Sequence, residues 1–299
     1  MLKVLGTKPY NDKTRNYGDC IVFIDNNTAV IYDCGSVEHA ERVIQLLNQY
    51  DIEKAVLILS HNDDDHFAGI HYLINAGIVD KLFTILLLKY KDDILDAIDD
   101  KRHTRDSIAK LIKEMYDNVA SLSEKVALRD VYENEDELPS AVHFVGPDYD
   151  YMIKAVAKGL DGRQGDIVDK ETITNAASVQ IQLDFGGKHM LLTGDCAPMA
   201  IPKDFDLSSM DFIQLPHHGK PSLADDIFDR VGQNNRIIYF ISDNTGNSNG
   251  GSDDLNTKGR NVKNTKRGDD IDVDSTISPI KQTGLLLPPL TGKTLGVIQ

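Results

Sequence analysis

The sequence predicts an α/β fold, in which short buried strands alternate with amphipathic helices. Apolar runs bounded by turn-forming residues recur along most of the chain, and stretches with apolar residues at helical spacing lie between several of them. Three of the strand-like runs end in acidic or histidine side chains. Because an α/β sheet builds its site at the carboxyl ends of its strands, this last observation predicts a site as well as a fold.

The first third of the chain predicts a hairpin, two helices and two further strands. Residues 20–24 and 29–32 form the hairpin, with a turn between them. Ser36 can cap the first helix, whose apolar face consists of Val37, Ala40, Val43, Ile44 and Leu47. A strand buried on both faces is predicted at 55–59 and another strand at 81–88. Between them lies a short helix marked by Phe67, Ile70, Leu73 and Ile74.

From Asp92 to about Leu128 the pattern becomes charged and helical. Its apolar residues form one stripe at helical spacing, namely Ile108, Leu111, Ile112, Met115, Val119 and Leu122. We interpret this segment as a helical insertion that packs through the stripe. A lid, a dimer surface and simple packing are all compatible with the pattern.

Beyond the insertion the α/β alternation returns and then ends. Strands are predicted at 142–145, 179–183, 189–192, 212–215 and 236–241, with a helix at 224–231. After Ser242 the composition shifts to Asn, Gly, Ser and Asp, which predicts an irregular C-terminal extension over about 243–299. We therefore expect a single domain over residues 1–299, interrupted by the insertion.

Charge and hydropathy exclude several classes of protein. The chain has 32 Lys and Arg against 47 Asp and Glu, a net charge of −15, which argues against a broad surface for nucleic acid. The basic run from Lys258 to Arg267 is compatible with local phosphate contacts or with a solvated loop. No apolar run approaches the ~20 residues of a membrane helix, and no signal-peptide core begins the chain. We expect a soluble, cytoplasmic protein.

Histidine and carboxylate side chains dominate the candidate metal ligands. Cys20, Cys34 and Cys196 form no C-x-x-C pair, so a thiolate zinc site is not indicated. The run His61-x-Asp63-x-Asp65-His66 directly follows the strand at 55–59, and this spacing lets one tight loop hold two cations. Further ligands follow two later strands. The complete candidate set is His61, Asp63, Asp65, His66, Asp195, His217 and His218.

These motifs resemble the metallo-β-lactamase superfamily, and within it the hydrolase domain of ComEC-type competence proteins. The likeness rests, in family order, on Gly18-Asp19, Asp33-Cys34-Gly35, the run from Ser60 to His66, Asn175-Ala-Ala-Ser178-Val179, Leu192-Thr193-Gly194-Asp195 and Pro216-His217-His218-Gly219. It spans residues 1 to about 242 apart from the insertion. The resemblance implies an αββα sandwich with a site for two divalent ions at one edge.

The resemblance also implies a role for each side chain. His61 and Asp63 would hold one ion, and Asp65, His66 and one of the adjacent histidines the other, with His217 favoured. Asp195 would bridge the ions. Asp65 and Asp195 are the candidate catalytic residues. Asp33 would orient the ligand loop, because a metal-bound histidine needs a partner on its other nitrogen. Asn175, Ser178 and Lys220 are the remaining candidates for supporting or substrate contacts.

Three positions depart from the family pattern. The commoner pattern has histidine where this chain has Asp63 and Asn175, although ComEC-like members look similar to this chain there. The family motif usually ends His-His-Gly-Ser, whereas Lys220 stands at its last position and introduces a cation in place of a hydroxyl. Added carboxylate oxygen favours harder ions, so Mn²⁺ competes with Zn²⁺ for the two metal positions.

The predicted function is metal-dependent hydrolysis by a metal-bound hydroxide. The resemblance points to a phosphodiesterase or nuclease whose substrate is a nucleotide or nucleic acid. One alternative is a hydrolase of a small ester, thioester or lactam, which an apolar pocket would favour. Another is a non-catalytic binding or regulatory protein that keeps the fold with an incomplete site and binds little metal.

Overall fold

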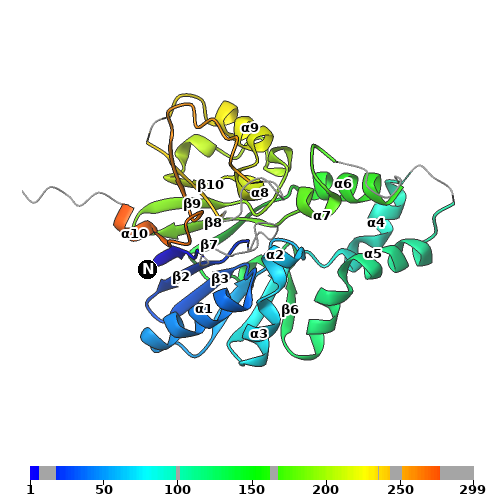
Figure 1. Ribbon diagram of the computed structural model, residues 1–299. Coiled ribbons are helices and arrows are strands. Elements are labelled where there is room, and N and C mark those ends of the chain that lie inside the picture. Colours follow the sequence, from blue (N-terminus) through cyan, green and yellow to red (C-terminus); the bar gives the residue numbers. More distant parts are fainter. Residues whose placement is uncertain (7–17, 99–101, 162–167, 235, 243–250, 277–299) are drawn as a thin grey trace, which may run out of the picture.

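Two β-sheets pack face to face and helices cover their outer faces, which gives four layers (Figure 1). The structure is a computed structural model that describes residues 1–6, 18–98, 102–161, 168–234, 236–242 and 251–276. The arrangement confirms the predicted α/β class and its two-sheet architecture.

The first sheet has seven strands in the order β13-β1-β2-β3-β4-β5-β6. Pairing is antiparallel from β13 to β3 and parallel from β3 to β6. The bounds are β1 (Leu2–Val4), β2 (Ile21–Asp25), β3 (Thr28–Tyr32), β4 (Ala55–Ile58), β5 (Val79–Thr84), β6 (Ala127–Asp130) and β13 (Ile271–Asp272). The predicted hairpin is the β2–β3 pair.

The second sheet has six strands in the order β12-β11-β10-β9-β8-β7. Pairing is parallel from β12 to β9 and antiparallel from β9 to β7. The bounds are β7 (Val142–Gly146), β8 (Gln180–Phe185), β9 (Lys188–Leu192), β10 (Phe212–Gln214), β11 (Ile238–Ile241) and β12 (Asn261–Asn264). Each sheet therefore contributes parallel strands whose carboxyl ends are free to build a site.

The main core lies between the two sheets, and the alternation of side chains along each strand builds it. In β2, Ile21 and Phe23 belong to this core, whereas Val22 and Ile24 belong to the layer beneath the helices. Phe212 and Phe240 enter the same core from the second sheet. The loops at the strand ends thus stand on a close-packed apolar base.

Helices α1 (Val37–Gln49) and α3 (Ile70–Asn75) cover the first sheet, and α9 (Pro221–Val231) covers the second. Ser36 caps α1 as predicted, because its hydroxyl accepts a hydrogen bond from the His39 amide at 3.1 Å. The shorter helical segments are α2 (Asp64–Phe67), α7 (Ile173–Ala176), α8 (Pro216–Gly219) and α10 (Val273–Thr276). Single 3₁₀ turns occupy Leu87–Tyr90, Ser121–Glu124, Glu135–Glu137, Pro198–Ala200 and Leu207–Ser209.

The segment predicted as a helical insertion contains α4 (Lys91–Asp96) and α5 (Arg105–Ala120), which lie beside α6 (Tyr149–Asp161) at one end of the molecule (Figure 1). Its last two residues instead begin β6, so the predicted end at Leu128 is too late. The predicted apolar stripe packs in two directions because α5 bends at Tyr116. Ile112 joins the core between the sheets, whereas Val119 joins the layer beneath α1 and α3.

The strand predicted at 81–88 ends earlier than expected, at Thr84. The buried Asp130 carboxylate accepts a hydrogen bond from the Leu86 amide at 2.7 Å, and the chain turns there into a 3₁₀ segment. Apolar composition alone does not reveal this stop, because Leu86, Leu87 and Leu88 continue the run that began in the strand.

The prediction of an irregular chain after Ser242 is wrong for residues 251–276. This segment adds β12 to one sheet, β13 to the other and the short helix α10. The basic run helps to dock it on α9: Lys258 pairs with Asp225 at 2.7 Å, and the Arg260 guanidinium lies 4.3 Å above the Phe228 ring. Residues 243–250 and 277–299 lie outside the described part of the chain.

None of the helices in the described residues combines the length and the hydrophobicity needed to span a bilayer. The fold is thus organised around the core between two sheets, and both sheets are completed at an edge by the segment 251–276.

The contact between Arg42 and Asp270 offers a test of how that segment docks. Arg42 of α1 contacts both carboxylate oxygens of Asp270, at 2.6 and 2.5 Å, and Asp270 also accepts from the Gly6 amide at 3.1 Å. Because the charged hydrogen bonds are lost, we expect Asp270→Asn to lower the free energy of unfolding by about 1–2 kcal/mol, measured by urea denaturation.

Glu114→Gln serves as the control, because the Lys110–Glu114 pair is fully on the surface of α5 at 3.8 Å. Its effect should stay below about 0.5 kcal/mol. Equal losses in the two variants would show that Asp270 does not anchor the C-terminal strands.

Candidate metal centre

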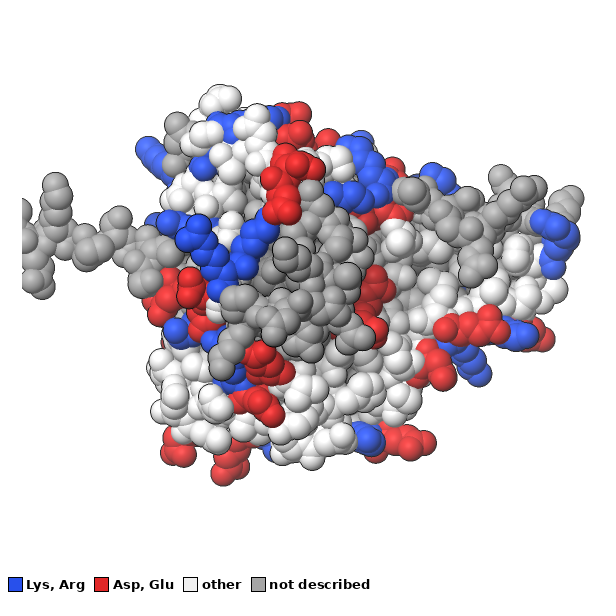
Figure 2. Space-filling model, viewed as in Figure 1, with Lys and Arg blue, Asp and Glu red and all other residues white. Residues whose placement is uncertain are grey.

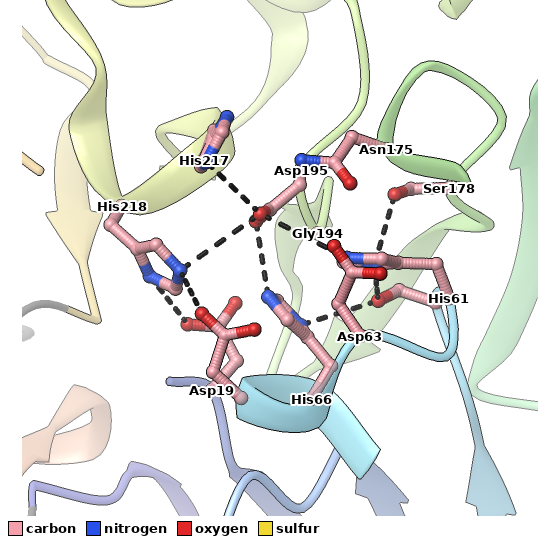
Figure 3. Close-up of polar contacts among 12 residues, drawn as sticks. Asp19, His61, Asp63, His66, Asn175, Ser178, Gly194, Asp195, His217 and His218 are labelled. Carbon is pink, nitrogen blue, oxygen red and sulfur yellow. Dashed lines mark hydrogen bonds and ion pairs between the residues drawn. The ribbon is translucent and has the colours of Figure 1, made fainter. Parts of the chain in front are cut away.

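The candidate ligands lie at the carboxyl ends of three strands. The loop after β4 carries His61 and Asp63 and leads into α2, the loop after β9 carries Asp195, and α8 after β10 carries the two adjacent histidines. The structure brings all of these side chains together around Asp195 (Figure 3).

The Asp195 carboxylate is the centre of the cluster and is almost fully buried. Its Oδ1 lies 3.2 Å from Nε2 of His66. Its Oδ2 lies 3.9 Å from Nε2 of His61, 3.6 Å from Nε2 of His217 and 3.9 Å from Nε2 of His218. Four imidazoles therefore turn the same nitrogen toward one carboxylate (Figure 3).

Several of these donor atoms are buried without a hydrogen-bond partner. They are Nε2 of His61, Nε2 of His66 and Oδ1 of Asp195. A buried polar atom without a partner is costly, and such atoms are normally satisfied by protein, water or an ion. The donors of His61, His66 and Asp195 lie within 4.8 Å of one another, as do those of Asp65, His66 and His218. The residues present therefore fit divalent metal ions.

The loop that carries His66 is held by the end of the β2–β3 hairpin. The Asp33 carboxylate accepts hydrogen bonds from the Ser60 amide and hydroxyl, each at 2.7 Å, and contacts Nδ1 of His66 at 2.8 Å. Because Asp33 occupies Nδ1, Nε2 of His66 is left to face Asp195. The role of Asp33 in orienting a metal ligand stays a prediction.

The segment that carries His66 packs so closely against residue 18 that only glycine fits there. Gly18 has φ of +62°, and a Cβ atom there would lie 1.5 Å from the backbone oxygen of Asp65. The next residue, Asp19, donates its amide to that same oxygen at 3.0 Å. Close backbone approach at Gly18 thus fixes α2 against the start of the hairpin.

The adjacent histidines have different partners, and this corrects the expectation that His217 joins Asp65 and His66. Nε2 of His218 lies 3.0 Å from Oδ2 of Asp65, whereas Nδ1 of His217 lies 2.7 Å from Glu171. Both histidines have positive φ, +50° and +54°. This left-handed backbone, unusual for bulky residues, is the reason that neighbours in sequence diverge.

Two carboxylates near the cluster carried no predicted role. Oδ1 of Asp19 lies 3.7 Å from Nδ1 of His218, and Asp19 also accepts from the Gln214 amide. Glu171 contacts His217 and, through its Oε1 atom, Nζ of Lys220 at 2.6 Å. Asp19 belongs to the Gly-Asp motif of the resemblance, so the sequence indicated a position near the site. Glu171 follows a polar stretch typical of a solvated loop, and no sequence motif indicated that it lies near the site.

The remaining predicted residues lie at the edge of the cluster. The Ser178 hydroxyl lies 3.2 Å from Nδ1 of His61. The Asn175 side-chain amide contacts Glu171 at 3.3 Å and the Thr172 hydroxyl at 2.8 Å. Asp63 is the most open candidate ligand, with 48% of its side chain exposed, and its Oδ2 lies 3.7 Å from Nε2 of His61.

Burial and charge give these groups unusual titration. Burial lowers the pKa of His61 to about 3. Burial also opposes the charged form of His218, but Asp195 and the hydrogen bond to Asp65 outweigh it and raise the pKa of His218 to about 10. A protonated His218 therefore places a positive charge beside these carboxylates. A bound metal cation would do the same.

Comparison with known proteins agrees with this architecture. Residues 14–103 match the model of the Metallo-beta-lactamase superfamily. The metallo-beta-lactamase fold protein YhfI from Bacillus subtilis is similar with 12% identity and a TM-score of 0.50, over 90% of this chain and 98% of that one. At this identity the likeness shows the fold alone. No curated protein matches the sequence.

Two further solved structures are more distant in shape. A diphosphatase from the PhnP family has 12% identity and a TM-score of 0.47, over 90% of this chain and 96% of its own. The short form of human tRNase Z has 12% identity and a TM-score of 0.44, over 90% and 98%. Residues 14–103 are thus similar to the Metallo-beta-lactamase superfamily, and the likeness to YhfI shows the fold. The ComEC-type assignment within it stays a prediction.

Asp33 provides a test of how the centre is held. In Asp33→Asn the amide nitrogen cannot accept the hydrogen bonds from His66 and the Ser60 hydroxyl, so we expect metal affinity to fall about 10–100-fold. The measurement is competition with a chromophoric chelator. Asp184→Asn removes a similar carboxylate contact, 2.7 Å from Nδ1 of His189 at the opposite end of β9, and should leave metal affinity unchanged. A similar loss in both variants would contradict the role of Asp33.

Proposed function

We propose that this protein is a metal-dependent hydrolase that cleaves phosphodiester bonds. The observation that carries the proposal is the buried Asp195 carboxylate, surrounded by four Nε2 atoms from three strand ends. A carboxylate in this position can contact two ions at once, and the ions of two-metal hydrolytic sites lie about 3.5–4 Å apart.

In this proposal the ligands would divide between two metal positions that share Asp195. His61 and Asp63 would hold the first ion, and Asp65, His66 and His218 the second. When bound, the two ions supply Lewis acidity and an activated water. The protein's own part is to fix the ligands: Asp33 and the Ser242 carbonyl accept from Nδ1 of His66 and His218, at 2.8 and 2.7 Å.

The demand for two ions supports a phosphodiester as substrate. Asp63, Asp65, Asp195 and a metal-bound hydroxide would contribute four negative charges, which two divalent ions balance. Displacement at phosphorus also requires charge stabilisation on both the attacking and the leaving oxygen, which a pair of ions provides.

The surface supports a nucleotide-sized substrate more than a long nucleic acid. Acidic and basic side chains are interspersed on the face shown in Figure 2. In the basic run, Lys258 and Lys266 form ion pairs with Asp225 and Asp253, and Arg260 donates to the carbonyls of Phe228 and Gly232. These cations support the docking of 251–276 and are committed to protein contacts.

A cavity in the described part of the molecule favours the ester alternative as a second candidate. It has a volume of about 260 Å³ and lies between the end of β5, the bend of α5 and β6. Its walls are mostly apolar, including Ile85, Leu87 and Val119. Because it lies at the same sheet edge as the ligand loop after β4, it could receive the apolar group of an ester or thioester.

The central test is Asp195→Ala with metal-loaded protein. Substrates are bis(p-nitrophenyl) phosphate, a cyclic dinucleotide, single-stranded DNA and p-nitrophenyl butyrate. We expect phosphodiester cleavage by the native protein and a loss of at least about 10³-fold in kcat/KM in the variant, because both ions lose a ligand worth several kcal/mol. Asp184→Asn is the folded control.

The outcomes separate the candidates. Cleavage of the butyrate ester alone would favour the ester hydrolase, and a protein that binds no metal would favour the non-catalytic alternative. Near-native phosphodiesterase activity in a well-folded Asp195→Ala protein would contradict the proposal.

Metal preference gives an independent prediction that centres on Asp63. Carboxylate oxygen suits Mn²⁺ and imidazole suits Zn²⁺, so we expect faster turnover with Mn²⁺ and a shift of the preference toward Zn²⁺ in Asp63→His. The measurement is turnover of one substrate by metal-stripped protein reconstituted with each ion. Faster turnover with Zn²⁺, together with an unchanged ratio in the variant, would show that Asp63 does not tune the metal.

A further inference from the structure

The cavity beside the bend of α5 has features of a binding site in its own right. It has a volume of about 260 Å³ and is bounded by the segment 85–89 after β5, by α5 and by Leu128 of β6. Its buried lining residues are Ile85, Leu87, Ile112 and Val119. Its exposed lining residues are Lys89, Lys113, Ala120 and Ser123. The cavity therefore reaches from the surface into the apolar interior.

The bend of α5 explains why this space is not filled. Tyr116 has φ of −124° and ψ of 19°, which divides the helix into two halves. Ile112 of the first half packs between the sheets, and Val119 of the second half packs beneath α1 and α3. Because the halves pack on different layers, they leave a hollow against the segment 85–89. A concave apolar surface of this kind is typical of a ligand site.

The cavity adjoins the loop that carries two of the candidate metal ligands. Asn62 lies between them in sequence, and its side-chain amide donates to the Met115 carbonyl and to Oδ1 of Asn118, each at 2.8 Å. Asn118 donates in return to the Asn62 carbonyl at 3.3 Å. Tyr116 and Val119, which line the cavity, belong to the same turns of α5. A ligand in the cavity therefore rests on the part of α5 that holds this loop.

The size and the walls of the cavity suit an aliphatic chain. An apolar cavity of about 150 Å³ is large enough to bind benzene, so about 260 Å³ admits a chain of about eight carbons. Leu86, Leu88 and Leu128 are half-buried and extend the apolar wall toward the opening. Among the described lining residues, no polar side chain is buried, so the interior offers no side-chain partner to a charged group.

The rim of the cavity carries two lysines that differ in their partners. Lys89 forms an ion pair with Glu133. Lys113 is exposed and forms no ion pair within the part of the chain that the structure describes. Its neighbour Glu114 pairs with Lys110 at 3.8 Å. An anionic group at the end of a bound chain would therefore find one available cation at the rim, and a single negative charge matches it.

We propose that this cavity binds a medium-chain carboxylate, with its aliphatic chain against the apolar wall and its carboxylate paired with Lys113. The inference goes beyond the proposed hydrolase, because the ligand is held by residues outside the metal centre. Binding requires neither a metal ion nor turnover, so it is tested separately from the proposed function.

The test of the chain compares ligands of different length on the full chain by isothermal titration calorimetry. Octanoate and butyrate share the carboxylate but differ by four methylene groups. Each methylene that leaves water contributes about fourfold in affinity, so we expect octanoate to bind at least about 50-fold more tightly than butyrate. A carboxylate bound anywhere by charge alone would show no such dependence on length.

Two variants locate the ligand, and each has a matched control. Ala120→Phe places a ring at the opening from the last residue of α5, and octanoate affinity should fall at least about 10-fold. Ala97→Phe makes the same change at an exposed alanine at the end of α4, outside the cavity lining, and should bind as the native protein does. Circular dichroism of each variant establishes that the fold is kept.

Lys113→Ala tests the head group, with Lys154→Ala on α6 as its control. Loss of an exposed ion pair should weaken octanoate binding about 2–5-fold and leave the affinity for neutral 1-octanol unchanged. Lys154→Ala should change neither affinity.

Three results would overturn the proposal. If octanoate binds no more tightly than butyrate, no aliphatic chain enters the cavity. If Ala120→Phe binds octanoate with native affinity, the chain is bound elsewhere. If Lys113→Ala retains native affinity for octanoate, the ligand is not an anion paired with this lysine. Each result leaves the metal-dependent function as it stands, because no metal takes part in these measurements.

Discussion

The need to place positive charge beside one buried carboxylate governs this structure. Asp195 lies at the end of β9 with almost no access to solvent, and a lone carboxylate cannot remain charged there at low cost. Four imidazoles surround it, and each is supported in turn by groups from other strands. Asp33 comes from the hairpin, Ser242 from the end of β11 and Glu171 from the segment before β8. Assembly of the centre therefore requires both sheets.

The two sheets depend on each other through this centre as well as through their shared core. The Tyr32 hydroxyl at the end of β3 donates to the Val179 carbonyl at 2.6 Å, and the Val179 amide donates to the Ser60 carbonyl at 2.9 Å. Gln214 of β10 donates to Asp19, and its side-chain oxygen accepts from the Thr193 and Gly194 amides at 2.8 and 3.2 Å. These buried hydrogen bonds fix the strand ends relative to one another, and so fix the ligands.

Much of this architecture could be predicted from local patterns. The hairpin, the cap at Ser36 and the ligand run after β4 are each encoded within a few residues, by alternation, turn composition and spacing. Contacts between distant segments could not be predicted in this way. The partner of His217 is 46 residues away, and the stop of β5 at Thr84 depends on Asp130. Composition also wrongly predicted that residues 251–276 are irregular, because their strands form only by pairing with β1 and β11.

The strands at the two sheet edges set an order of events during synthesis. β1 pairs with β13, so Lys3 lies opposite Asp272, and β12 closes the second sheet beside β11. A chain that emerges from the ribosome with its first residues leading has neither edge closed until the residues near 270 have left the exit tunnel. Ser242, whose carbonyl orients His218, emerges after every candidate ligand. The candidate ligands are therefore all oriented only once the chain beyond β11 has been made.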